Sequence, residues 1–135
     1  MKATFPPILN SSLPPSFRSI RLELAREPDH PTGDAGVAYV VLAPLDPNGK
    51  IDAELWRRHR DACRVARLRP GKDQDTGHLV HRPGGSWAFH YDGNGEIADE
   101  EGYHFSDEQF VPGEYVSLRE GETMRTFKVA AVTRL

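Results

Sequence analysis

Apolar and polar residues alternate over several short stretches of the chain, as they do in strands that bury one face. Residues 17–24 follow this pattern, with Ile20, Leu22 and Leu24 on the same side. Residues 37–42 form instead a continuous apolar run, which predicts a strand covered on both faces. Shorter apolar stretches predict further strands, at residues 65–68, 103–105, 110–111, 115–119 and 124–132.

The pattern is clearest over residues 78–91, where two short strands flank a Pro-Gly-Gly turn at residues 83–85. On the second strand Trp87, Phe89 and Tyr91 alternate with smaller or polar residues. Aromatic side chains that alternate beside a tight turn predict a face anchored in the core. We therefore expect this hairpin to be the structural centre of the domain.

One helix is predicted, over about residues 52–63. Asp52 has the residue type of an N-cap, whose side chain accepts hydrogen bonds from the free N–H groups of the first turn. Glu54 is favourable near the positive end of the helix dipole. Ile51 before the cap and Trp56 after it match a hydrophobic staple, which supports a helix start at this point.

The connections after residue 64 are short and hairpin-like, and a single helix makes parallel crossovers improbable. These features predict an α+β fold of mostly antiparallel strands, in which a curled sheet or a small, partly open barrel is covered at one end by the helix. At 135 residues the chain has the size of one domain. We place this domain at residues 17–135 and expect residues 1–16, which include four prolines, to form a disordered tail.

The composition of the chain also indicates a cellular compartment. No apolar run approaches the roughly 20 residues that a membrane helix needs, and the first residues lack the apolar core of a signal peptide. The single cysteine, Cys63, cannot form a disulfide within the chain. The sequence therefore predicts a cytoplasmic protein that does not insert into a membrane.

Charge is distributed unevenly along the chain, although the net charge is only −3. Residues 57–72 include seven Lys or Arg and one acid, whereas residues 83–118 include eight acids and no Lys or Arg. The two segments can pair with each other, within one molecule or in a homo-oligomer, or the basic one can bind an anionic protein or nucleic acid. Arg57, Arg58 and Arg60 are the candidate phosphate contacts, but no known nucleic-acid-binding motif is present.

The histidines of the hairpin are candidate ligands for a divalent metal, which is the one cofactor that the sequence suggests. A two-residue turn would place His81 near His90, whereas a three-residue turn would place His78 directly opposite His90. His104 and Asp92 would complete the site, because zinc and iron need three or four ligands. The alternative is that these histidines face solvent on the polar side of the hairpin and bind no metal.

No residue stands out as catalytic. His59 and Cys63 are four residues apart in the predicted helix and could form a thiolate pair, but two core-facing residues have the same spacing. No nucleophile elbow, phosphate-binding loop or dinucleotide fingerprint occurs in the chain. These observations favour a binding protein over an enzyme.

Three stretches of the chain, residues 52–64, 77–92 and 110–119, resemble a family of short, uncharacterised bacterial proteins. The resemblance extends over most of the chain after residue 18. That family has no established activity, cofactor or catalytic residue, so the resemblance implies no particular function.

We therefore expect a small, non-enzymatic binding or interaction module. Its working surface would be the hairpin flanked by the basic helix, with binding residues Trp87, His90, Arg57, Arg58 and Arg60. Two alternatives remain: a metal-dependent enzyme with histidine ligands, and a nucleic-acid-binding protein that uses the basic segment.

Overall fold

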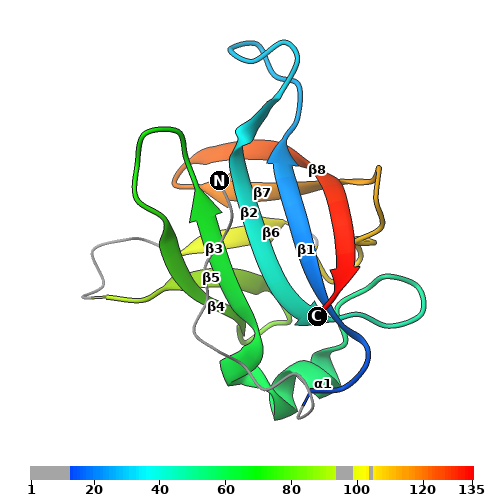
Figure 1. The fold of residues 1–135 in the computed structure, drawn as a ribbon. Coiled ribbons are helices and arrows are strands. Elements are labelled where there is room, and N and C mark those ends of the chain that lie inside the picture. Colours follow the sequence, from blue (N-terminus) through cyan, green and yellow to red (C-terminus); the bar gives the residue numbers. More distant parts are fainter. Residues whose placement is uncertain (1–12, 94–98, 104) are drawn as a thin grey trace.

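The computed structural model of the chain describes residues 13–93, 99–103 and 105–135 (Figure 1). These residues form eight strands, the short α-helix α1 (Ala53–Arg58) and a turn of 3₁₀ helix, η2 (Arg60–Ala62). The strands are β1 (Phe17–Leu24), β2 (Asp34–Pro44), β3 (Arg64–Leu68), β4 (Asp75–His81), β5 (Trp87–Tyr91), β6 (Glu100–Tyr103), β7 (Tyr115–Glu120) and β8 (Thr123–Arg134).

Every strand pairs antiparallel with the next one along the chain, and β8 returns to pair with β1. These pairings close the sheet into a barrel, with α1 at one end and the long β1–β2 loop at the other (Figure 1). The prediction of a curled, mostly antiparallel sheet is confirmed. The barrel is closed and not partly open, however, because the last strand, β8, pairs with the first, β1.

The helix is shorter than the predicted residues 52–63, because α1 ends at Arg58 and the chain continues as η2. Asp52 is the N-cap, as predicted, and its Oδ1 accepts the backbone N–H of Leu55 at 3.1 Å. The helix ends where His59 adopts φ −131°, outside the helical region. Since α1 has only six residues, the sheet dominates the described fold and the α+β label describes it poorly.

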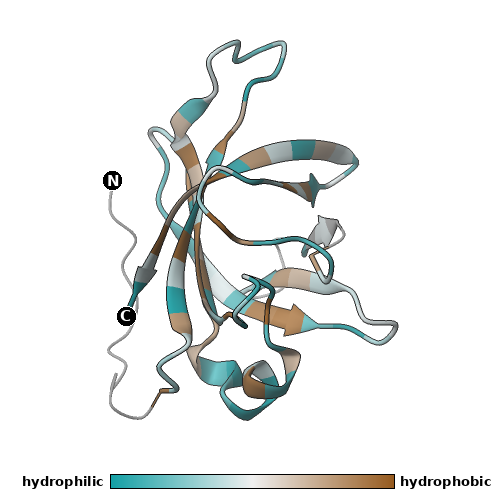
Figure 2. Ribbon diagram, turned by 90° about the vertical axis from the view of Figure 1, so that its right-hand side faces the viewer, coloured by the Kyte–Doolittle hydropathy of each residue, from teal (hydrophilic) through white to brown (hydrophobic). Residues whose placement is uncertain are grey.

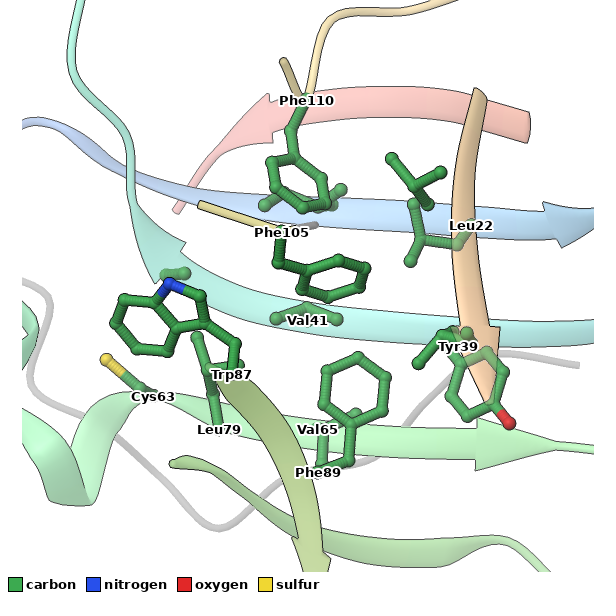
Figure 3. Close-up of a cluster of buried hydrophobic side chains, with 14 of the residues drawn as sticks. Leu22, Tyr39, Val41, Cys63, Val65, Leu79, Trp87, Phe89, Phe105 and Phe110 are labelled. Atoms are coloured by element: carbon green, nitrogen blue, oxygen red, sulfur yellow. The ribbon is translucent and has the colours of Figure 1, made fainter. Parts of the chain in front are cut away.

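Apolar side chains fill the interior of the barrel. Apolar and polar bands follow one another along the strands in Figure 2, as expected where every second residue faces inward. Trp87, Phe89 and Tyr91 are only 2%, 0% and 3% exposed, which confirms the aromatic face of the hairpin as part of the core. In the close-up of Figure 3, Trp87 and Cys63 lie on one side of the cluster and the hydroxyl of Tyr39 on the opposite side.

Two phenylalanines from the connection between β6 and β7 complete the core. Phe105 and Phe110 are 1% and 2% exposed, and their rings contact each other edge to face, 5.1 Å between centroids. The predicted strands at 103–105 and 110–111 are therefore wrong: β6 ends at Tyr103, and both phenylalanines lie in the loop. Such short apolar stretches have no periodicity of their own, so the sequence cannot separate a strand from a loop that covers the core.

The β4–β5 hairpin adopts the three-residue turn at positions 83–85, so His78 lies opposite His90. The backbone N–H of Arg82 donates to the carbonyl of Ser86 at 2.8 Å and closes the turn. Gly84 has φ +92°, in the left-handed region that glycine adopts at little cost. Of the two registers that the sequence allowed, the second is the one formed.

Most of the tail predicted at residues 1–16 lies outside the described residues. Leu13 is the first described residue, and its half-buried side chain packs against the main core cluster. Among the helices that the structure describes, none has both the length and the apolar surface that crossing a bilayer would require.

Candidate functional site

A hollow lies where α1 and η2 meet the β4–β5 hairpin. Its volume is about 310 Å³, and it is lined by Trp56, Arg60, Asp61, His78, Leu79, Val80, His81 and His90. The fold therefore brings four residues of the sequence-based hypotheses to one place, namely His78, His81, His90 and Arg60. Trp87, the aromatic candidate, does not line the hollow: it is buried, and its ring packs against the lining residues Trp56 and His81.

Ring contacts with the buried Trp87 hold two aromatic residues of the lining, Trp56 and His81, in place. The imidazole of His81 lies parallel to the indole of Trp87, with 4.1 Å between centroids and 16° between planes. Trp56 meets both rings edge to face, at 5.8 Å from His81 and 5.3 Å from Trp87. Its indole N–H also donates to the carbonyl of Leu79 at 2.8 Å, which ties the helix to β4. These contacts hold the aromatic surface in one orientation without a ligand.

Of the three arginines predicted to bind, only Arg60 lines the hollow. Its guanidinium lies over the ring of Trp56, 4.9 Å from the centroid, and no ion pair to it occurs within the described part of the chain. Arg57 and Arg58 instead contact the carboxylate of Glu54, at 2.7 and 3.4 Å, on the exposed side of α1. Arg60 belongs to η2, beyond the end of α1, and is thereby separated from Arg57 and Arg58.

The hairpin histidines interact with carboxylates. Nδ1 of His90 is 2.8 Å from Oδ1 of Asp99, and Nδ1 of His78 is 3.5 Å from Oδ1 of Asp92. Asp92 also accepts from Arg64 at 3.0 Å. In the residues that the structure covers, no group of three or more His, Cys, Asp or Glu could hold a metal ion. The other proposed ligand, His104, lies outside the described residues.

Ion pairs within the chain engage most of the basic segment. Arg64 contacts Asp92 at 3.0 Å and Arg67 contacts Glu100 at 2.9 Å, so the basic and acidic segments meet inside one molecule. Arg67 and Arg69 also share the carboxylate of Asp75, at 2.7 and 2.9 Å. Among the described residues, these pairs account for charges that the sequence alone would leave free for a partner.

The pair formed by His59 and Cys63 has no geometry for catalysis. Cys63 is completely buried, and burial raises the pKa of its thiol to about 12. A thiol with so high a pKa is a poor nucleophile near neutral pH. The ring of His59 packs edge-on against Phe17, with 5.8 Å between centroids. Both residues therefore serve packing at the end of the barrel near α1.

A second cluster, which sequence reasoning missed, lies at the end of the barrel opposite α1. Glu100 is only 3% exposed, and its carboxyl accepts hydrogen bonds from the hydroxyls of Tyr39 and Tyr91 and from Arg67. The hydroxyl of Tyr39 also contacts Glu120. The available signal was the position of two tyrosines in core-facing stretches, because a buried tyrosine hydroxyl needs a polar partner.

Burial controls the protonation of this second cluster. It raises the pKa of Glu100, while the hydrogen bond from Tyr91 and the charge of Arg67 act in the opposite direction. Burial also raises the pKa of Tyr39 and of Tyr91, so both phenols are neutral donors. The cluster is thus a buried acid held by two neutral hydroxyls and one guanidinium.

Comparisons with known proteins do not assign the chain to a group: no family model, curated protein or solved structure matches it.

Proposed function

We propose that the chain is a binding module whose ligand occupies the hollow between α1, η2 and the β4–β5 hairpin. The observation that carries this proposal is the convergence on that hollow of Trp56, Arg60, His78, Val80, His81 and His90. Its volume of about 310 Å³ suits a small molecule or a single side chain of a partner protein.

The chemistry of the lining favours a flat, apolar ligand with one anionic substituent. Trp56 and Val80 supply apolar surface, and the rings beneath are already fixed by their mutual contacts. Arg60, without an acidic partner among the described residues, supplies a cation for a carboxylate. Asp61 lines the same hollow, so a ligand with several negative charges would meet a repulsive group.

Nuclear magnetic resonance can test this proposal with benzoate as the anionic probe and benzyl alcohol as the uncharged one. Benzoate should shift the indole N–H of Trp56 and the imidazole signals of His78 and His90. For so small a probe in an open hollow we expect a Kd near 1 mM, about −4 kcal/mol. The absence of shifts at these residues, or shifts confined to another face, would contradict the proposal.

The variant Arg60→Gln should weaken benzoate binding about tenfold and leave benzyl alcohol binding unchanged, since about 1.4 kcal/mol corresponds to that factor. Arg57→Gln is the matched control, because Arg57 is paired with Glu54 and does not line the hollow.

Two further measurements test the alternative functions. A single-stranded oligonucleotide that loses affinity equally in Arg57→Gln, Arg58→Gln and Arg60→Gln would favour nucleic-acid binding over the hollow. Co-purified zinc or iron in elemental analysis, together with metal-dependent shifts of His78, His81 and His90, would favour a metal site.

A further inference from the structure

Tyr39 lies between two glutamates at the end of the barrel opposite α1. Its hydroxyl oxygen is 2.9 Å from Oε1 of Glu100, and it also contacts Oε2 of Glu120. A phenol has one proton and can donate to only one of these oxygens. If both glutamates were ionised, one contact would join two oxygens with no proton between them.

The neighbouring donors do not supply the missing proton. Tyr91 donates its single proton to Oε1 of Glu100, and Arg67 donates to Oε2 of Glu100 at 2.9 Å. Arg125 donates to Oε1 of Glu120 at 3.1 Å. These three donors hydrogen-bond to Glu100 or Glu120, and in the described residues none of them donates to the hydroxyl of Tyr39. The glutamate to which Tyr39 does not donate must therefore itself carry a proton.

The charges around this pair lead to the same count. Five charged residues surround the two glutamates. One lies in the β1–β2 loop and the others lie on or beside β3, β4 and β8; they are Glu27, Arg67, Arg69, Asp75 and Arg125. Together with Glu100 and Glu120, these residues comprise four carboxyl groups and three guanidinium groups. His30 contacts Glu27 at 3.0 Å and also faces Asp34 at the outer edge of the cluster. One additional proton makes the inner cluster electrically neutral.

We propose that Glu100 and Glu120 share one proton through the hydroxyl of Tyr39, so that the folded protein retains one protonated carboxyl group at neutral pH. The burial of Glu100 supports this, since an ionised carboxylate loses its hydration there and the neutral form is favoured. The two glutamates and Tyr39 form one coupled site, and the proton belongs to the site rather than to a single residue.

The shared proton makes the stability of this end of the barrel dependent on pH. The ordinary pKa of glutamate is 4.5, and the pKa of Glu100 is raised in the folded state. Above pH 4.5, Glu100 is therefore more fully protonated in the folded protein than in the unfolded chain. Consequently the stabilisation is complete below this value and is lost as the pH rises through the pKa of the folded state.

Infrared spectroscopy of the folded protein tests the proposal directly. At pH 7 the wild-type spectrum should contain the C=O band of one protonated carboxyl group, and ¹³C-labelled glutamate should shift that band. The band should disappear in both Glu100→Gln and Glu120→Gln and persist in Glu122→Gln, which changes an exposed turn residue between β7 and β8. A folded wild-type protein with only ionised carboxylates at pH 7 would overturn the proposal.

Unfolding measurements provide a second test that does not depend on Glu100→Gln being folded. In Glu120→Gln the side-chain amide can donate to Tyr39 at every pH, in place of the shared proton. Its free energy of unfolding should therefore decrease less between pH 5 and pH 9 than that of the wild type. Glu122→Gln should follow the wild type, whereas parallel pH profiles for Glu120→Gln and the wild type would refute proton sharing.

Discussion

The side chain that faces a position across the interior of this barrel can determine which residue type fits there. Gly102 on β6 has the ring of Phe105 directly above it, and a Cβ at this position would lie 2.4 Å from two ring atoms. Phe105 is fully packed and cannot move away without disturbing Phe89 and Phe110. A glycine is therefore required here by the close approach of a side chain.

Replacement of Gly102 by alanine should lower the free energy of unfolding by about 2 kcal/mol, since overpacking a core costs roughly 1–3 kcal/mol. Urea denaturation monitored by tryptophan fluorescence can measure the change. In a Phe105→Leu background the same substitution should cost less, because the smaller side chain leaves room for the methyl group.

Gly36→Ala is a suitable control for this experiment. Gly36 is an exposed residue of β2, and a Cβ there would meet only the side chains of Asp34 and Pro70, at 3.1 and 3.2 Å. Its effect should be smaller than that of Gly102→Ala. Equal effects at both positions would show that the contact with Phe105 does not determine the cost.

At the scale of elements, the helix α1 depends on its ends and on one buried side chain. Six residues are too few for a helix to be stable by itself in water. Asp52 caps the first turn, and Trp56 is the buried residue of the helix, fastened to β4 through its indole N–H. The position of the hollow therefore depends on a cap and on one tryptophan.

Asp52→Ala should destabilise the protein by about 1 kcal/mol, the usual cost of removing an N-cap side chain. Asp52→Asn retains an oxygen acceptor for the N–H of Leu55 and should cost only a few tenths of that amount. Chemical denaturation measures both values. If the two variants lose the same stability, the charge of Asp52 and not its hydrogen bond is what matters.

At the scale of the whole molecule, the closed sheet leaves the core accessible only when strands separate. Cys63 is 0% exposed in this core, and its thiol has a pKa of about 12. A thiol reagent can therefore modify Cys63 only after opening of the barrel, which makes this side chain a reporter of global unfolding.

At pH 8, Cys63 of the folded protein should react with 5,5′-dithiobis(2-nitrobenzoate) at least about 10³ times more slowly than in urea, given a stability of about 5 kcal/mol. The release of the coloured thiolate measures both rates. A folded protein whose thiol reacts within about tenfold of the denatured rate would contradict a buried Cys63.

The features that depend on neighbouring residues can be predicted from the sequence. Alternation along the chain gave the strands around Ile20, Leu22 and Leu24, and the residue types at the start of α1 gave its N-cap. The inward face of the β4–β5 hairpin followed from the alternation of Trp87 and Phe89 beside a tight turn. Periodicity and capping are local properties, so a single sequence contains them.

Contacts between residues far apart in the sequence follow from the fold. The closure of β8 onto β1, the role of Phe105 in the core, the hollow beside Arg60 and the meeting of Glu100 with Tyr39 each join separate parts of the chain. Such contacts depend on strand register and barrel closure, which determine which inward side chains share a layer. The alternation of apolar and polar residues predicts which side chains are buried, but the three-dimensional fold determines which other side chains they contact.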